Sequence, residues 1–168
     1  MKHPVIFWIL TVLGVFTLHL TVAGNIAILG AAPNFLLLST VFFAVRAGPM
    51  KGEVLGFLWG LLSDVASTSV FGSQAFMLTF VGFVVGKLEG KVDEDKYAAQ
   101  MTLVFIMSVV NLLGLALLES IFGGAPQRFK DKSALLGPFY STLLCPVVYW
   151  GLLRWRSIFR RSDLKRFQ

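Results

Sequence analysis

Charged residues are scarce in this chain, and their absence from long stretches excludes a water-soluble globular protein. Only 14% of the 168 residues are charged and 56% are hydrophobic, with a mean hydropathy of +0.76. No charged residue interrupts residues 5–32, 101–118 or 133–153. A helix needs roughly 20 residues to cross the hydrocarbon core of a bilayer. The sequence therefore predicts one membrane domain that covers residues 1–168.

The residue types that carry chemistry are few as well. The single cysteine, Cys145, excludes an intrachain disulfide, and the two histidines are too far apart in sequence for a spaced pair of metal ligands. The chain has no phosphate-binding glycine loop, no nucleic-acid module and no Gly-x-Ser-x-Gly turn. His19 and Asp64 with Ser67 or Ser69 formally permit an intramembrane hydrolase, but no flanking pattern supports one. We expect no enzyme, no cofactor, no metal and no nucleic-acid partner.

The apolar runs predict six membrane helices and an all-α fold. The expected helices cover residues 4–23, 32–46, 50–66, 73–89, 98–121 and 133–153, and a basic tail follows over 154–168. The second run, from Pro33 to Val45, gives only about 20 Å of helix. A re-entrant hairpin is the alternative, but it would bury Arg46, Lys51 and Glu53 in lipid at a cost of several kcal/mol. Full spanning keeps these charges in water, with local thinning or a longer helix making up the length.

The basic residues predict the orientation of the chain in the membrane. Three of the 15 lysines and arginines fall on the side opposite the termini, at Arg128, Lys130 and Lys132, and the rest fall on the side of the termini. This bias predicts that both termini face the cytoplasm. Six basic residues lie in the tail, which should attract anionic lipid headgroups. The basic outer loop at 123–132 is either a hydrated connection or a docking surface.

Small residues recur at every fourth position of the third expected helix. We call this set the glycine stripe; it comprises Gly52, Gly56, Gly60 and Asp64. At about 100° per residue these positions share one helix face. In lipid, small residues let another backbone approach closely, and an intramembrane acid needs a partner or water. Two interpretations stay open: contacts within the bundle, with Gly82 and Gly86, or a binding face for a partner's helix oriented by Asp64.

Polar residues also gather near the outer ends of the expected helices. They are Asn34, Asp64, Gln74, Asn111 and Glu119. These residues could line an outward polar cavity for a ligand or a groove for a partner. For Asp64 the alternative is a carboxylate in headgroup water or a cap for a neighbouring helix.

The order of several short motifs adds a family resemblance. Pro33 opens the second run, Arg46-Ala-Gly48-Pro49 forms a turn, the glycine stripe follows, and Gly72 comes next. In this order and spacing, over about a third of the chain, the sequence resembles the bacterial rod-shape-determining membrane protein MreD. That family often has an acidic residue directly after the proline, where this chain has Asn34, so no role for a charge is carried over there.

The resemblance implies a non-enzymatic scaffold of the cell-elongation machinery, the peptidoglycan-synthesising elongasome, in the bacterial inner membrane. Its implied partners are MreC, RodA with its penicillin-binding transpeptidase, and indirectly the actin-like MreB. The family is also similar in architecture to the substrate-binding subunits of energy-coupling-factor transporters. The alternative function is therefore a membrane subunit that binds a small molecule or lipid. We expect the scaffold, binding single-pass helices of its partners laterally.

Overall fold

The computed structural model describes residues 3–25, 32–67, 70–92, 96–122 and 132–164, and over these residues the chain forms helices and no strand. The helices are α1 (His3–Asn25), α2 (Phe35–Ala47), α3 (Pro49–Ala66), α4 (Ser73–Gly86), α5 (Tyr97–Phe122) and α6 (Lys132–Leu164). The prediction of an all-α fold is thus confirmed for the described chain, and most helix ends lie within three residues of the expected bounds.

The first part of the predicted basic tail, residues 154–164, is helical, because α6 continues to Leu164. Residues 154–164 contain neither glycine nor proline, so nothing in the local sequence stops the helix after the apolar run. Residues 165–168 of the expected tail, and the expected outer loop except for Lys132, lie outside the described residues.

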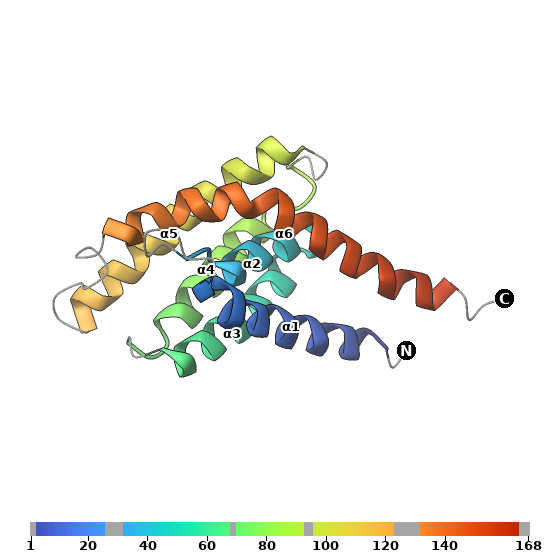
Figure 1. Cartoon of the computed structure of the whole chain (residues 1–168), viewed down its shortest axis with the longest axis horizontal. Coiled ribbons are helices and arrows are strands. Elements are labelled where there is room, and N and C mark those ends of the chain that lie inside the picture. The colour runs from blue at the N-terminus through green and yellow to red at the C-terminus, as the bar shows by residue number, and fades with distance from the viewer. Residues whose placement is uncertain (1–2, 26–31, 68–69, 93–95, 123–131, 165–168) are drawn as a thin grey trace.

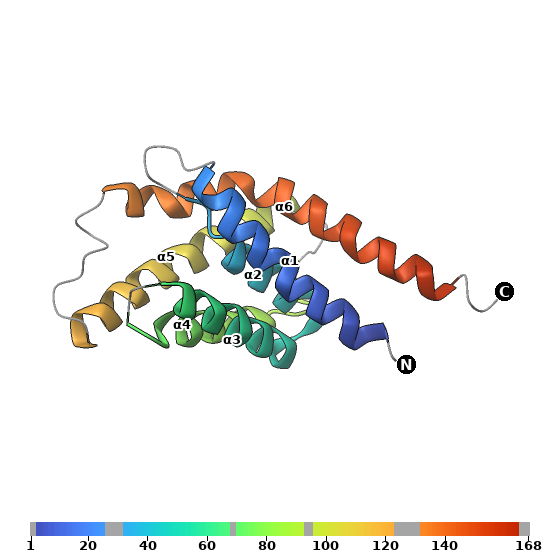
Figure 2. The same cartoon turned by 60° about the horizontal axis from the view of Figure 1, so that its bottom comes forward.

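The helices alternate in direction, and both ends of the chain point to the same end of the bundle (Figures 1 and 2). We call this the inner end and the opposite one the outer end. Within the described residues, Ala98–Phe122 and Leu135–Trp155 are long and apolar enough to cross a membrane. Shorter apolar segments cover Trp8–Val22, Phe35–Ala47 and Ser73–Gly86. That all six helices cross the bilayer remains a prediction.

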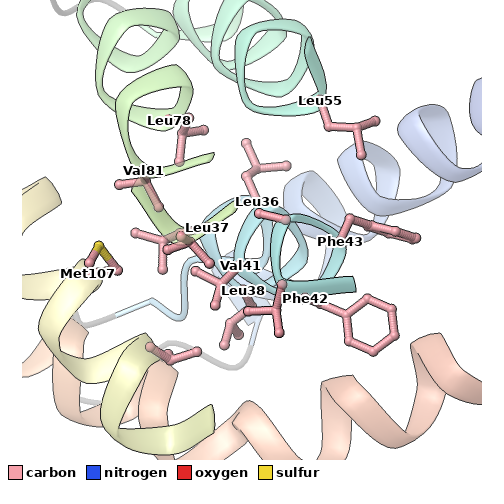
Figure 3. Close-up of a cluster of buried hydrophobic side chains, with 14 of the residues drawn as sticks. Leu36, Leu37, Leu38, Val41, Phe42, Phe43, Leu55, Leu78, Val81 and Met107 are labelled. Atoms are coloured by element: carbon pink, nitrogen blue, oxygen red, sulfur yellow. The ribbon is translucent and has the colours of Figure 1, made fainter. Parts of the chain in front are cut away.

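Helix α2 forms the centre of the bundle. Every side chain from Phe35 to Val45 is buried, because α2 contacts each of the other five helices. Figure 3 shows its leucine, valine and phenylalanine side chains pointing outward in several directions, toward α4 and α3 on one side and α6 on the other. Because α2 is enclosed by protein, its length need not match the thickness of the lipid bilayer. Its 13 residues are therefore enough.

Polar contacts fix the register of α2 against its neighbours. At its outer end the Asn34 side chain accepts a hydrogen bond from the Leu37 amide (3.0 Å), and the Asn34 amide donates to Ser141 Oγ on α6 (3.0 Å). Near its inner end Phe42 packs edge-on against Tyr149 of α6, with ring centroids 5.1 Å apart. Because both contacts join residues 107 positions apart, helices α2 and α6 run parallel, with an N-cap at the outer end of α2.

Helix α1 is attached to the bundle at one level by two indole groups. Trp59 of α3 donates from Nε1 to the carbonyl oxygen of Val12 (3.2 Å), and Trp155 of α6 donates from Nε1 to Thr11 Oγ1 (3.1 Å). One level further in, Trp8 packs against Phe43 with centroids 5.3 Å apart. The inner half of α1 is thus held from two sides.

Candidate functional site

The glycine stripe of α3 lies directly against the backbone of α4. A Cβ atom placed on Gly52 would lie 2.6 Å from the Gly82 carbonyl oxygen, and one on Gly56 or Gly60 would meet the backbone of Leu78 or Ala75 at less than 3.0 Å. All three glycines are buried. The two helices approach so closely because α3 carries no side chain at these points.

This packing corrects one of the two interpretations of the stripe. A partner's helix cannot use this face, because the α4 backbone already fills it. Gly82 and Gly86 complete the contact from the other side, where a Cβ on Gly86 would collide with Pro49. Contacts within the bundle, the other interpretation, are what the structure shows.

Asp64 ends the stripe at the outer end and caps α4. Its side chain is only 2% exposed. Oδ1 accepts a hydrogen bond from the Gln74 amide (3.1 Å), and Oδ2 accepts one from the Ala75 amide (2.9 Å). These amides belong to the first turn of α4, whose N-cap residue Gly72 (φ 91°) has no side chain to offer. A carboxylate there satisfies unpaired N–H groups and opposes the helix dipole.

The inner end of the same helix pair has a related arrangement that the sequence did not reveal. Gly48 adopts φ 84° as the N-cap of α3, which begins with Pro49. The carboxylate of Glu89, which follows α4, lies against Gly48, and a Cβ there would be 2.6 Å from Glu89 Oε2. The available signal was a helix that starts after Gly-Pro without any capping side chain of its own.

The five residues of the predicted outward cavity separate into different places. Asp64 and Gln74 meet at the α4 cap, and Asn34 caps α2 beside α6. Asn111 of α5 is buried, and its Oδ1 has no hydrogen-bond partner among the described residues. Glu119 lies two turns further along α5, about 12 Å away along the helix axis. Asp64 and Gln74 are joined by a hydrogen bond, and a cavity that they share with the other three residues remains a proposal.

The remaining turn residues lie at both ends of α2. Pro33 is buried directly before the Asn34 cap. At the other end Arg46 lies in the last turn of α2, with its guanidinium carbon 4.2 Å from the Phe42 ring centroid. A cation in the last turn is favoured by the helix dipole.

These features define a class: an all-helical protein with segments long and apolar enough to cross a membrane, in which Asp64 caps one of its own helices and Ser141 joins two of them. The family model described as rod shape-determining protein MreD matches residues 1–154. The chain belongs to the MreD family. A comparison with curated proteins and one with solved structures find no match.

Family membership confirms the resemblance predicted from the motifs and gives a role in rod-shape determination as a bacterial membrane protein. The family is part of the MreBCD shape-determining system and is not a known enzyme family. The partners, the topology and the binding surface of this chain are matters for proposal.

Proposed function

We propose that the protein is a non-enzymatic membrane scaffold of the cell-elongation machinery that binds the single transmembrane helix of MreC. RodA and its penicillin-binding transpeptidase would join the same assembly, and MreB would be linked indirectly. Membership in the MreD family supports the process. The exposed face of α1 supports the binding mode and carries the proposal.

One face of α1 is exposed and includes a glycine and two threonines. Its members are Leu10, Gly14, Thr17, Leu18, Thr21 and Asn25, all exposed. The spacing of three or four residues keeps them on one side of the helix. A Cβ on Gly14 would meet nothing within 4 Å. A helix from another protein could therefore approach the α1 backbone closely at this face.

Two of the polar side chains on this face bond to the backbone of α1 itself. Thr21 donates from Oγ1 to the Thr17 carbonyl (2.8 Å), and Asn25 donates from Nδ2 to the Thr21 carbonyl (2.7 Å). These side chains can therefore face lipid when no partner is bound. A bound helix would be stabilised mainly by close van der Waals packing against α1.

Another open glycine in a membrane helix provides a matched comparison. Gly151 of α6 is exposed and also has nothing within 4 Å of a Cβ. Its neighbours Val147 and Trp150 are bulky and 63% and 65% exposed. Large side chains keep a second backbone at a distance, so this part of α6 is a poor binding face.

The test compares Gly14→Leu with Gly151→Leu in tagged protein purified from membranes that contain MreC. We expect Gly14→Leu to reduce co-purified MreC several-fold and Gly151→Leu to leave it unchanged. Melting temperatures of both variants check that each is folded. Undiminished capture by a folded Gly14→Leu variant would remove α1 as the binding face.

A second candidate function is a membrane subunit that binds a small molecule or lipid. Ser108 and Asn111, one turn apart on α5, are both buried with side-chain oxygens that lack a partner among the described residues. Buried polar groups are usually satisfied, so a bound molecule is one way to complete them. Ligand-induced stabilisation that disappears in Asn111→Leu would favour this candidate. Stabilisation that persists in this variant would count against Asn111 as the site.

A further inference from the structure

We propose that the hairpin of α3 and α4 thins the bilayer beside it, so that the lipids along this side of the bundle form a layer thinner than an ordinary membrane. The inference rests on the proposed membrane embedding of the chain and does not depend on any protein partner.

Helices α3 and α4 form one side of the bundle and present apolar side chains outward. They pack against each other and against α2, and α6 packs on the opposite side of α2 (Figures 2 and 3). Val54 and Phe57 of α3 are exposed, as are Phe76 and Phe80 of α4. In a membrane these apolar side chains face the acyl chains of the surrounding lipids.

The ammonium group of Lys87 marks the inner limit of this apolar face. Its Nζ lies 4.1 Å from the ring centroid of Phe83, one turn back along α4. The charge therefore lies at the level of Phe83 and does not extend further toward the inner end. A lysine in the hydrocarbon layer is costly. Headgroups or water must consequently reach the level of Phe83.

The apolar length between the polar ends of the hairpin is short. Helix α4 begins at Ser73, and the distance from there to Phe83 is about 15 Å along the helix axis. On α3 the half-buried Glu53 has no side-chain hydrogen bond among the described residues. From Glu53 to the helix end at Ala66 the distance is about 20 Å. The hydrocarbon core of a typical bilayer is about 30 Å thick.

The opposite side of the bundle matches an ordinary bilayer. The apolar segment Leu135–Trp155 of α6 has 21 residues, or about 31 Å of helix. A tilt of the hairpin would only shorten its projection on the membrane normal, so a tilt cannot compensate for the missing length. A short helix is accommodated by outward-reaching flanking side chains or by a thinner bilayer. Because the Lys87 ammonium lies back over Phe83, thinning is the remaining way to match the hairpin.

The experiment measures thermal unfolding of the purified full chain in vesicles of phosphatidylcholines that differ only in acyl-chain length. Lys87→Leu removes the charge and lengthens the apolar face of α4 by about one turn, or 5 Å. Lys91→Leu is the matched control, because Lys91 is also exposed but lies in the turn after α4. We expect the wild type and the control to be most stable in bilayers thinner than about 30 Å. The maximum for Lys87→Leu should shift toward longer acyl chains.

A second measurement leaves Lys87 in place. A polarity-sensitive fluorescent amino acid is introduced at position 83 of α4 and, for comparison, at position 147 of α6. Val147 is 63% exposed and lies near the middle of the apolar segment of α6. In bilayers of ordinary thickness we expect emission typical of headgroups from position 83 and emission typical of hydrocarbon from position 147.

Hydrocarbon-like emission from both positions would overturn the proposal. The same preferred chain length for the wild type and a folded Lys87→Leu variant would also overturn it. Release of the wild type from the vesicles at alkaline pH would contradict the membrane embedding, and the proposal with it. None of these measurements contains MreC, so failure of the thinning leaves the proposed scaffold function open to its own test.

Discussion

Gly52 of α3 and Gly82 of α4 each occupy the space in which a side chain of the other would have to lie. A Cβ built on either residue collides with the backbone of its counterpart. The relationship repeats along the pair, from Gly86 and Pro49 at the inner end to Gly60 and Ala75 at the outer end. Helices α3 and α4 therefore form one closely packed hairpin, and the glycine spacing serves this hairpin.

A first prediction concerns Gly56, in the middle of this contact. Gly56→Ala places a methyl group into the Leu78 backbone, so the helices must separate. We expect a loss of about 1–3 kcal/mol of stability, as for overpacked cores. Thermal unfolding in detergent measures it, with Gly151→Ala as the control in open space. Equal melting temperatures for the two variants would contradict the packing described.

A second prediction concerns the cap that Asp64 provides. Asp64→Ala leaves the amides of Gln74 and Ala75 without acceptors, at a cost of about 1–2 kcal/mol. Hydrogen exchange at these two amides should become faster while exchange in the middle of α5 stays unchanged. Glu53→Gln, on the same helix but without a side-chain hydrogen bond among the described residues, is the control. Unchanged protection at residues 74 and 75 in Asp64→Ala would disprove the cap.

A third prediction separates two reasons for glycine at position 48. Gly48→Ala strains a backbone at φ 84° and also meets the Glu89 carboxylate. The strain alone costs about 1–3 kcal/mol, because φ 84° with ψ 176° is a conformation that only glycine adopts readily. Adding Glu89→Ala removes the collision but not the strain, so it should restore only part of the lost stability. Full restoration in the double variant would mean that the backbone conformation costs little.

A fourth prediction concerns topology. If all six helices cross the membrane with both termini in the cytoplasm, a phosphatase that is active only outside the cytoplasm should be active when fused after residue 67 or 125. It should be inactive when fused after residue 48 or 92. The basic residues near Lys51 and Lys87 support this orientation through the positive-inside tendency. Activity after residue 48 or 92 would contradict it.

The apolar runs predicted all six helices because hydrophobic length is a local property of the sequence. The enclosure of α2 was not predictable in the same way, since a run from Phe35 to Val45 looks alike whether lipid or protein surrounds it. The shortness of α2, which has 13 residues, was the available clue that protein rather than lipid surrounds it. The spacing of the stripe predicted a close approach, but spacing alone does not say which helix approaches. The partner of Asp64 followed from a missing cap at Gly72, and that signal becomes clear only once α3 and α4 are known to be neighbours.

The most direct test of the scaffold is photo-crosslinking in living membranes from a reactive residue placed at Thr17 of α1, with Val147 of α6 and Phe80 of α4 as comparisons. All three positions are accessible: Thr17 is exposed, and Val147 and Phe80 are 63% and 45% exposed. Our account predicts a crosslink to the MreC transmembrane helix from position 17 and little or none from the other two. Crosslinks from position 80 or 147 without one from position 17 would contradict it.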